Sequence, residues 1–211
     1  MSRRKPVTFE LAASRRRKRS IRDFRRQCYS MIGRTDLLQE DGAGGREQQR
    51  LDNQLNLIEA RSGDETVGTI RWGTYISVAG DDHYADLIIN NKTGLPSSEP
   101  ENFSRTDRLI IHPKYRRGTV LIGLARFCLR LAIEAGSRFD LCWSEQHLAR
   151  VYQRLGYTVL PQQLVNARAV TLYPQILNIQ QFQQRWSARN AVTPQSSATT
   201  QIDQNQLSTS C

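Results

Sequence analysis

The sequence predicts an α/β fold, and three features of the chain support that prediction. Residues 108–160 read in succession as a strand, a basic turn, an apolar helix, a strand, an amphipathic helix and a strand. The helix predicted over 119–135 is apolar on almost every side, which predicts burial in the core. Residues 51–60 and 66–72 read as two strands joined by a turn over 61–65, which predicts a hairpin.

Length and charge predict one domain with a basic N-terminus. The 211 residues are enough for a single domain with a sizeable core. The formal net charge is +10, and residues 1–26 carry most of it, with eleven Lys and Arg against two acids. We expect a basic arm over 1–20, a folded domain over 21–189 and a disordered tail over 190–211, where charged and large apolar residues are rare.

The basic N-terminus predicts an acidic partner. Nucleic acid, an anionic membrane and an acidic protein are the three classes that would neutralise residues 1–26. The alternative is a solvated, partly disordered arm that contacts none of them.

Further elements are predicted in the N-terminal half. Residues 8–32 predict a helix because apolar side chains recur at intervals of three and four, and Gly33 is a typical helix stop. Residues 39–50 and 92–102 predict loops from their Gly, Pro and polar content, and 83–91 predict a short helix.

Strands and helices alternate in the C-terminal half. The predicted strands cover 108–112, 139–143 and 169–173, and the predicted helices after the apolar one cover 145–155 and 176–188.

Cysteine usage and hydropathy make the cytoplasm the default expectation for this chain. The four cysteines have no paired spacing, which predicts reduced thiols. No apolar run approaches the roughly 20 residues that cross a bilayer. His83 and His147 have no ligand-like spacing relative to the cysteines, so the sequence predicts no metal site.

The turn before the apolar helix is a candidate phosphate site. The sequence KYRRG at 114–118 runs directly into the helix, and Arg116 and Arg117 stand beside its first backbone N–H groups. Amide donors at a helix N-terminus, together with guanidinium groups, form a cradle for phosphate. The alternative is a pair of solvated turn arginines.

The motifs in this region resemble a known family. Residues 105–161 resemble the core of the GNAT superfamily of acyl-CoA-dependent N-acyltransferases, and residues 51–73 resemble it more loosely. The resemblance implies a GNAT-like acyltransferase fold with a mixed, mostly antiparallel sheet and helices on both faces. It also implies an enzyme that transfers an acyl group from a thioester to an amine.

Within that superfamily the pattern is closest to the bacterial N-acyl amino acid synthases and acyl-homoserine-lactone synthases. Gly68–Arg71 matches their Gly-Thr-Ile-Arg strand end. Arg108 fills the arginine position that opens the next core strand, with Asp107 in place of the usual serine. These enzymes often take acyl groups from acyl carrier protein, an acidic protein that the basic residues 1–26 would suit.

The resemblance implies that the donor is either acyl-CoA or the acyl-phosphopantetheine of a carrier protein, bound as a co-substrate and not permanently. It also implies where this thioester donor would bind. The implied contacts are the strand residues Ile110, Ile111 and His112 and the turn residues Arg116, Arg117, Gly118, Thr119 and Val120. Thr119 and Leu121 stand where the family has glycines. Side chains there crowd a pyrophosphate, which favours the carrier-protein donor.

The resemblance also implies roles for side chains near the reaction. The Tyr-x-x-x-Gly-Tyr ending makes Tyr152 the proton donor to the departing thiolate, with packing on the amphipathic helix as the alternative. Arg71 and Arg108 are candidates to hold an amino acid carboxylate. A salt bridge with Asp107 or Glu59 is the alternative.

The sequence does not identify the general base: His112, Asp107 and Glu145 lie near the right strand ends, and each has an ordinary structural role as its alternative. The resemblance implies that ordered water can also deprotonate the amine. Trp143 is a candidate for the wall of an acyl pocket, and filling the core is its alternative role. The rival to an enzyme is a non-catalytic binding module with this fold, whose basic N-terminus contacts nucleic acid or an anionic membrane.

Overall fold

The computed structural model describes residues 5–34, 43–75, 99–116, 119–161, 164–165 and 171–191. The strands are Val7–Leu11 (β1), Asn56–Ser62 (β2), Glu65–Thr74 (β3), Phe103–Ile111 (β4), Phe139–Glu145 (β5), Thr158–Val159 (β6), Leu164–Val165 (β7) and Thr171–Asn178 (β8). The helices are Arg15–Met31 (α1), Ala43–Gln54 (α2), Val120–Glu134 (α4), Gln146–Arg154 (α5) and Ile179–Ala191 (α6), with short 3₁₀ turns at Pro100–Asn102 (η3) and Pro113–Tyr115 (η4).

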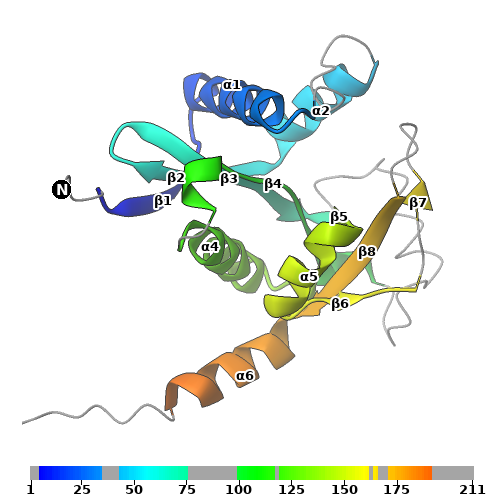
Figure 1. Ribbon diagram of the computed structural model, residues 1–211. Coiled ribbons are helices and arrows are strands. Elements are labelled where there is room, and N and C mark those ends of the chain that lie inside the picture. The colour runs from blue at the N-terminus through cyan, green and yellow to red at the C-terminus, as the bar shows by residue number, and fades with distance from the viewer. Residues whose placement is uncertain are drawn as a thin grey trace, which may run out of the picture.

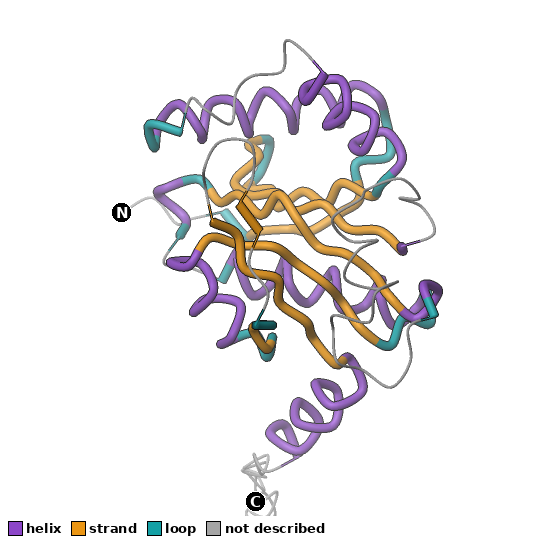
Figure 2. The backbone as a smooth tube through the Cα atoms, turned by 90° about the vertical axis from the view of Figure 1, so that its right-hand side faces the viewer, coloured by secondary structure: helices purple, strands orange, loops and turns teal. Residues whose placement is uncertain are grey.

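One mixed sheet organises the molecule. Its strand order is β1-β2-β3-β4-β5-β8-β6, and β7 also pairs with β8. The β4–β5 pair is parallel, and the other pairs are antiparallel. Helices α1 and α2 lie over one face and α4 lies under the other (Figure 1; Figure 2 shows the same layers after a 90° turn). The predicted α/β fold, mostly antiparallel with helices on both faces, is confirmed.

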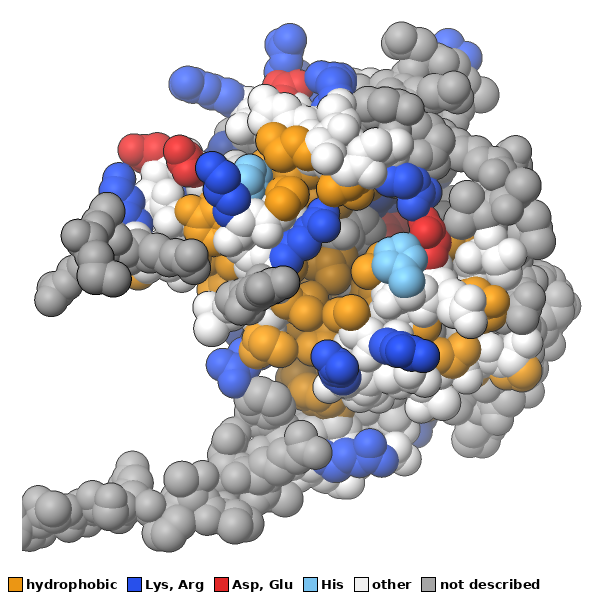
Figure 3. Space-filling model, viewed as in Figure 1, with side chains coloured by type: hydrophobic (Ala, Val, Ile, Leu, Met, Phe, Trp, Pro, Cys, Tyr) orange, Lys and Arg blue, Asp and Glu red, His pale blue; other side chains and the backbone are white. Residues whose placement is uncertain are grey.

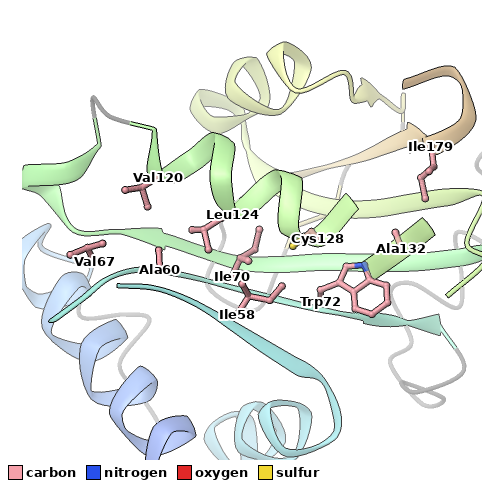
Figure 4. Close-up of a cluster of buried hydrophobic side chains, with 10 residues drawn as sticks. All are labelled: Ile58, Ala60, Val67, Ile70, Trp72, Val120, Leu124, Cys128, Ala132 and Ile179. Carbon is pink, nitrogen blue, oxygen red and sulfur yellow. The ribbon is translucent and has the colours of Figure 1, made fainter. Parts of the chain in front are cut away.

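The largest core cluster lies between the sheet and α4. Val120, Leu124, Cys128 and Ala132 repeat every four residues and pack as one stripe against side chains of β2 and β3 (Figure 4). Gly68 of β3 permits the contact, since a Cβ there would lie 2.8 Å from Val120 Cγ1. Burying a large aliphatic side chain such as Leu124 contributes roughly 1.5–3 kcal/mol before ordering entropy is subtracted.

One predicted segment has the wrong type, and two predicted helices begin too early. Residues 8–11 belong to β1 rather than to a helix, because they pair with β2, and α1 begins only after Ser14 accepts a capping bond from the Arg17 amide. Residues 43–54 form α2, not a loop and strand, because Leu51 and Leu55 are buried one turn apart. Strand β8 continues to Asn178 and displaces the start of the predicted C-terminal helix.

Other predictions are confirmed. The β2–β3 hairpin, the apolar helix, strand β5 and the amphipathic helix α5 lie where the sequence predicts them, within a few residues. The helix predicted at 83–91 and the tail after 191 lie outside the described residues. The segment 1–20, predicted as an arm, contains β1 and the first turns of α1. None of the described helices is long and apolar enough to cross a membrane.

Candidate functional site: a cleft where two parallel strands part

Strands β4 and β5 pair over only three residues of each strand. Phe103, Ser104 and Arg105 lie opposite Phe139, Asp140 and Leu141, and the described ladder stops there. Beyond that point β4 continues alongside β3, while β5 continues alongside β8. The facing edges of β4 and β5 therefore diverge in the middle of the sheet, and their backbone groups become available to another molecule.

A bulge in β4 begins at this divergence. The register between β3 and β4 shifts between Thr69, which lies opposite Ile110, and Arg71, which lies opposite Asp107. Arg108 occupies the extra position with φ of 52°, in the left-handed region that side chains other than glycine rarely adopt. Backbone strain of this kind persists where surrounding contacts hold it, and it is common at binding and catalytic sites.

An apolar cleft of about 110 Å³ opens beside the parted strands, between α4 and α5. Helix α4 contributes Leu121, Ala125 and Leu129, and α5 contributes Tyr152 and Leu155. In Figure 3 hydrophobic side chains gather in this hollow, with Lys and Arg side chains around it. Such a cleft favours an extended apolar ligand with a charged end outside.

A buried carboxyl group stands in the wall of the cleft. Asp140 Oδ1 accepts a 2.5 Å hydrogen bond from the Ser104 hydroxyl, and Oδ2 accepts a 2.6 Å bond from the Tyr157 hydroxyl. Burial raises the pKa of the Asp140 carboxyl above its usual range, although both hydrogen bonds act in the opposite direction. A buried acid with a raised pKa inside a cleft is a candidate functional group. Its sequence signal is an acid within the apolar strand FDLCW.

The predicted proton donor lies in this cleft. Tyr152 is 5% exposed and lines the cleft with Tyr157. The two rings meet edge to face with centroids 5.4 Å apart, which fixes the direction of the Tyr152 ring. Tyr152 therefore lies near the end of α5 in the wall of the cleft, and its role in proton transfer stays a prediction.

The predicted phosphate turn leads into α4 at the mouth of the cleft. Gly123 N–H donates to Thr119 O at 2.9 Å, so the amides of the preceding helical residues have no intrahelical acceptor. The Val120 side chain is buried in the core, which leaves only its backbone for a ligand. Arg116 is exposed and donates through Nε to Ile111 O at 3.3 Å. Arg117 and Gly118 lie outside the described residues.

The predicted strand residues flank the cleft without lining it. Ile110 packs against Phe24 and Cys28 of α1 on the opposite face of the sheet. Ile111 packs on the α4 cluster, and His112 Nδ1 accepts from the Lys114 amide at 3.2 Å. From β4, Thr106 and Leu109 line the cleft instead. The bulge at Arg108 changes which residues face each side, and the sequence gives no signal for it.

Arg71 belongs to a buried ion-pair network. It is 1% exposed and binds Asp107 through two hydrogen bonds of 2.6 and 2.7 Å, and Asp52 through one of 3.0 Å. Arg25 of α1 also binds Asp52, at 2.9 and 3.0 Å, and Arg105 binds Asp107 at 2.5 Å. The salt bridge between Arg71 and Asp107, one of the two alternatives in the sequence analysis, is therefore present, and Glu59 binds Arg17 of α1.

This network has consequences for two other candidates. Burial alone would raise the pKa of Asp107, but Arg71 and Arg105 outweigh it and hold that pKa far below its usual range. A carboxylate so stabilised is a poor general base. Arg108 donates through Nη1 to the Tyr29 hydroxyl of α1 at 3.3 Å.

Glu145 and Trp143 lie apart from the cleft lining. Glu145 binds Arg34 at 2.5 Å and lies 3.6 Å from His147. Trp143 packs with the Phe103 and Phe139 cluster, and neighbouring residues of a strand point to opposite faces. Asp140 and Trp143 therefore face opposite sides of β5. Trp143 packs against the core, which is its alternative role in the sequence analysis.

Comparison with known proteins identifies the fold. No protein-family model matches the chain, and no curated protein sequence matches it. Among solved structures, FeeM, an N-acyl amino acid synthase from uncultured soil microbes, has a TM-score of 0.62 at 11% identity, covering 85% of this chain and 94% of its own. A putative acetyltransferase from Acinetobacter baylyi has a TM-score of 0.58 at 13% identity, covering 84% and 94%. An aminoglycoside 6'-N-acetyltransferase solved with coenzyme A has a TM-score of 0.54 at 13% identity, covering 82% and 97%. The chain has the fold of GNAT-family N-acetyltransferases.

Proposed function

We propose that the protein is an N-acyltransferase that moves an acyl group from a thioester to an amine. The observation that carries the proposal is the parting of β4 and β5 beside an apolar cleft that holds Tyr152. An extended thioester arm can pair with the freed strand edges while its carbon chain contacts the apolar walls. The shared fold with an N-acyl amino acid synthase and with a coenzyme A-binding acetyltransferase supports this function.

The donor we propose carries a phosphopantetheine arm, as acyl-CoA and acyl carrier protein both do. The first-turn amides of α4 and the exposed Arg116 stand at the cleft mouth, where one phosphate would lie. Thr119 has helical backbone angles and no glycine freedom there, so a single phosphate is easier to accommodate than a pyrophosphate. This favours the carrier-protein donor.

The reaction needs one nucleophile, one leaving group and two proton transfers. The neutral amine attacks the thioester carbonyl carbon, a C–N bond forms, and the C–S bond breaks. The departing thiolate takes a proton from Tyr152, which recovers it from the ammonium through water. Thiols have an unperturbed pKa of about 8.5 and phenols of about 10, so this transfer depends on close placement of the phenol. The cleft cysteine Cys128 is no rival nucleophile, because burial raises the pKa of its thiol well above the usual value.

The test measures thiol release from acyl-CoA and acyl carrier protein in the presence of a panel of amines. Tyr152→Phe is expected to lower turnover roughly 10²–10⁴-fold while donor affinity stays within twofold. Tyr173→Phe is the matched control, since Tyr173 is a half-buried tyrosine of β8 outside the cleft lining, and it should keep full turnover. Equal turnover in all three proteins would assign Tyr152 to packing. Absence of thiol release with every donor would favour the non-catalytic module.

A further inference from the structure

Helix α1 carries two classes of cationic side chain. Three arginines of α1 bind carboxylates. Arg17 binds Glu10 and Glu59, Arg25 binds Asp52, and Arg26 binds Asp23. Among the described residues, four other arginines of the same helix have no carboxylate within ion-pair distance: Arg15, Arg16, Arg19 and Arg22. Helix α1 therefore has three arginines with a carboxylate partner and four without one among the described residues.

Two of these four arginines line a groove between α1 and α2. Arg15, Lys18 and Arg22 are spaced by three and four residues, so they share one face of α1. Gln49 and Asn53 face them from α2. The groove has a volume of about 550 Å³, and each of these five polar side chains can donate hydrogen bonds. None of the described residues that line the groove is acidic.

Some donors in the groove region are shielded from water without a partner. Arg22 Nη1 has no hydrogen-bond partner among the described residues and is inaccessible to solvent. One turn further along α1, Arg25 Nε and Nη2 are also inaccessible to solvent and have no hydrogen-bond partner among the described residues. Buried N–H groups nearly always have an acceptor, so Arg22 is an incompletely neutralised cation in the wall of this groove. Lys18 is anchored beside it, with Nζ 3.0 Å from Asp52 O and 3.1 Å from Asn53 O.

We propose that the α1–α2 groove binds a phosphate-bearing ligand. A phosphate group has several acceptor oxygens and a double charge, which match the forked guanidinium groups of Arg15 and Arg22. The volume lies within the roughly 300–1,000 Å³ that small-molecule sites have, so the phosphate is part of a larger organic molecule. Helices α1 and α2 lie on the opposite face of the sheet from α4, so this site is separate from the acyl cleft (Figure 1).

The test is a calorimetric titration of the full chain with inorganic pyrophosphate at fixed ionic strength. The wild-type protein should bind with one saturable site. Arg15→Gln and Arg22→Gln should each weaken binding roughly tenfold or more, as expected for loss of a charged hydrogen bond. Arg19→Gln is the matched control, because Arg19 is an exposed arginine on the same helix outside the groove, and it should change affinity less than twofold.

A second titration separates the two sources of phosphate. Phosphatidylglycerol vesicles in a phosphatidylcholine background present the same chemistry on a lipid, and sensitivity to Arg22→Gln but not to Arg19→Gln there would identify a lipid headgroup. Equal losses from Arg19→Gln and Arg22→Gln would overturn the proposal, since they would show attraction to total charge. Absence of binding to both probes would overturn it as well. Neither titration contains a thioester, so the result is independent of acyl transfer.

Discussion

Substitution of Asp107 by Asn should destabilise the fold, because Asp107 holds two buried guanidinium groups. Its carboxylate accepts bonds from Arg71 at 2.6 and 2.7 Å and from Arg105 at 2.5 Å. The Arg71 and Arg105 side chains are 2% and 6% exposed, and the Asp107 side chain is 15% exposed. An amide of the same size keeps one acceptor oxygen and loses the negative charge.

The expected loss is about 3 kcal/mol of unfolding free energy. Removing one partner of a buried ion pair costs roughly 3–5 kcal/mol, because a charge is left in a poorly solvated place. Arg71 also binds Asp52 at 3.0 Å, which limits the penalty to the lower end of that range. The total free energy of unfolding of a native domain is only about 5–15 kcal/mol, so the substitution should remove a large share of the stability.

Urea denaturation at pH 7 provides the measurement. With a slope of about 2 kcal/mol per M, the midpoint should fall by roughly 1.5 M at unchanged slope. The control is Asp23→Asn, which breaks an exposed pair with Arg26 whose side chains are 49–51% exposed, and it should cost under about 1 kcal/mol. A loss below about 1 kcal/mol for Asp107→Asn would refute the idea that this network is important for stability.

The pH dependence of the same comparison gives a second check. The folded pKa of Asp107 lies below the unfolded value of about 3.9, so its contribution is fully present above that value and is lost as pH falls through the folded pKa. The difference between wild type and Asp107→Asn should therefore be equal at pH 7 and pH 5 and should shrink below about pH 4. A difference that falls between pH 7 and pH 5 would contradict this assignment.

Three further predictions concern the core, the buried acid and the cleft. Gly123→Ala should lower the free energy of unfolding, measured by urea denaturation, by about 1–3 kcal/mol, because the new Cβ would lie 1.9 Å from Phe9 Cζ. In a Phe9→Ala background the same substitution should raise the free energy of unfolding, since alanine favours the helix by up to about 1 kcal/mol. Asp140 has a raised folded pKa, so wild type should gain stability relative to Asp140→Asn as pH falls from 7 towards 4, and an unchanged difference would refute the raised pKa. Ala125→Trp should fill the cleft and raise the donor KM at least tenfold, whereas Ile133→Trp, on the exposed side of the same helix, should not.

Sequence patterns identify the elements whose burial is continuous. Helix α4 is predictable because its apolar side chains recur every four residues and few polar side chains interrupt them. Helix α2 is missed because its first residues include Gly44 and Gly45 and its sequence contains a single large apolar residue, Leu51. Strand β1 is missed because it precedes a basic helix and has no pattern of its own beyond five residues.

The candidate site is only partly accessible from sequence. Tyr152 is predictable from its motif, since the helix period places it on the inner face of α5. The roles of Arg25 and Asp52 are not, because a basic run gives no sign of which arginine meets a distant carboxylate in the folded chain. Whether a charge is solvated or buried in a network depends on tertiary contacts, and the bulge at Arg108 likewise depends on pairing with β3.

The most direct test of the proposed acyl transfer is a crystal structure with a thioether analogue of an acyl-CoA, which cannot be cleaved. We predict the pantetheine chain between β4 and β5, with its sulfur beside the Tyr152 hydroxyl and its carbon chain against α4. An analogue bound elsewhere, or a cleft filled by side chains of the protein itself at saturating analogue, would contradict the assignment of this cleft as the place where the thioester reacts.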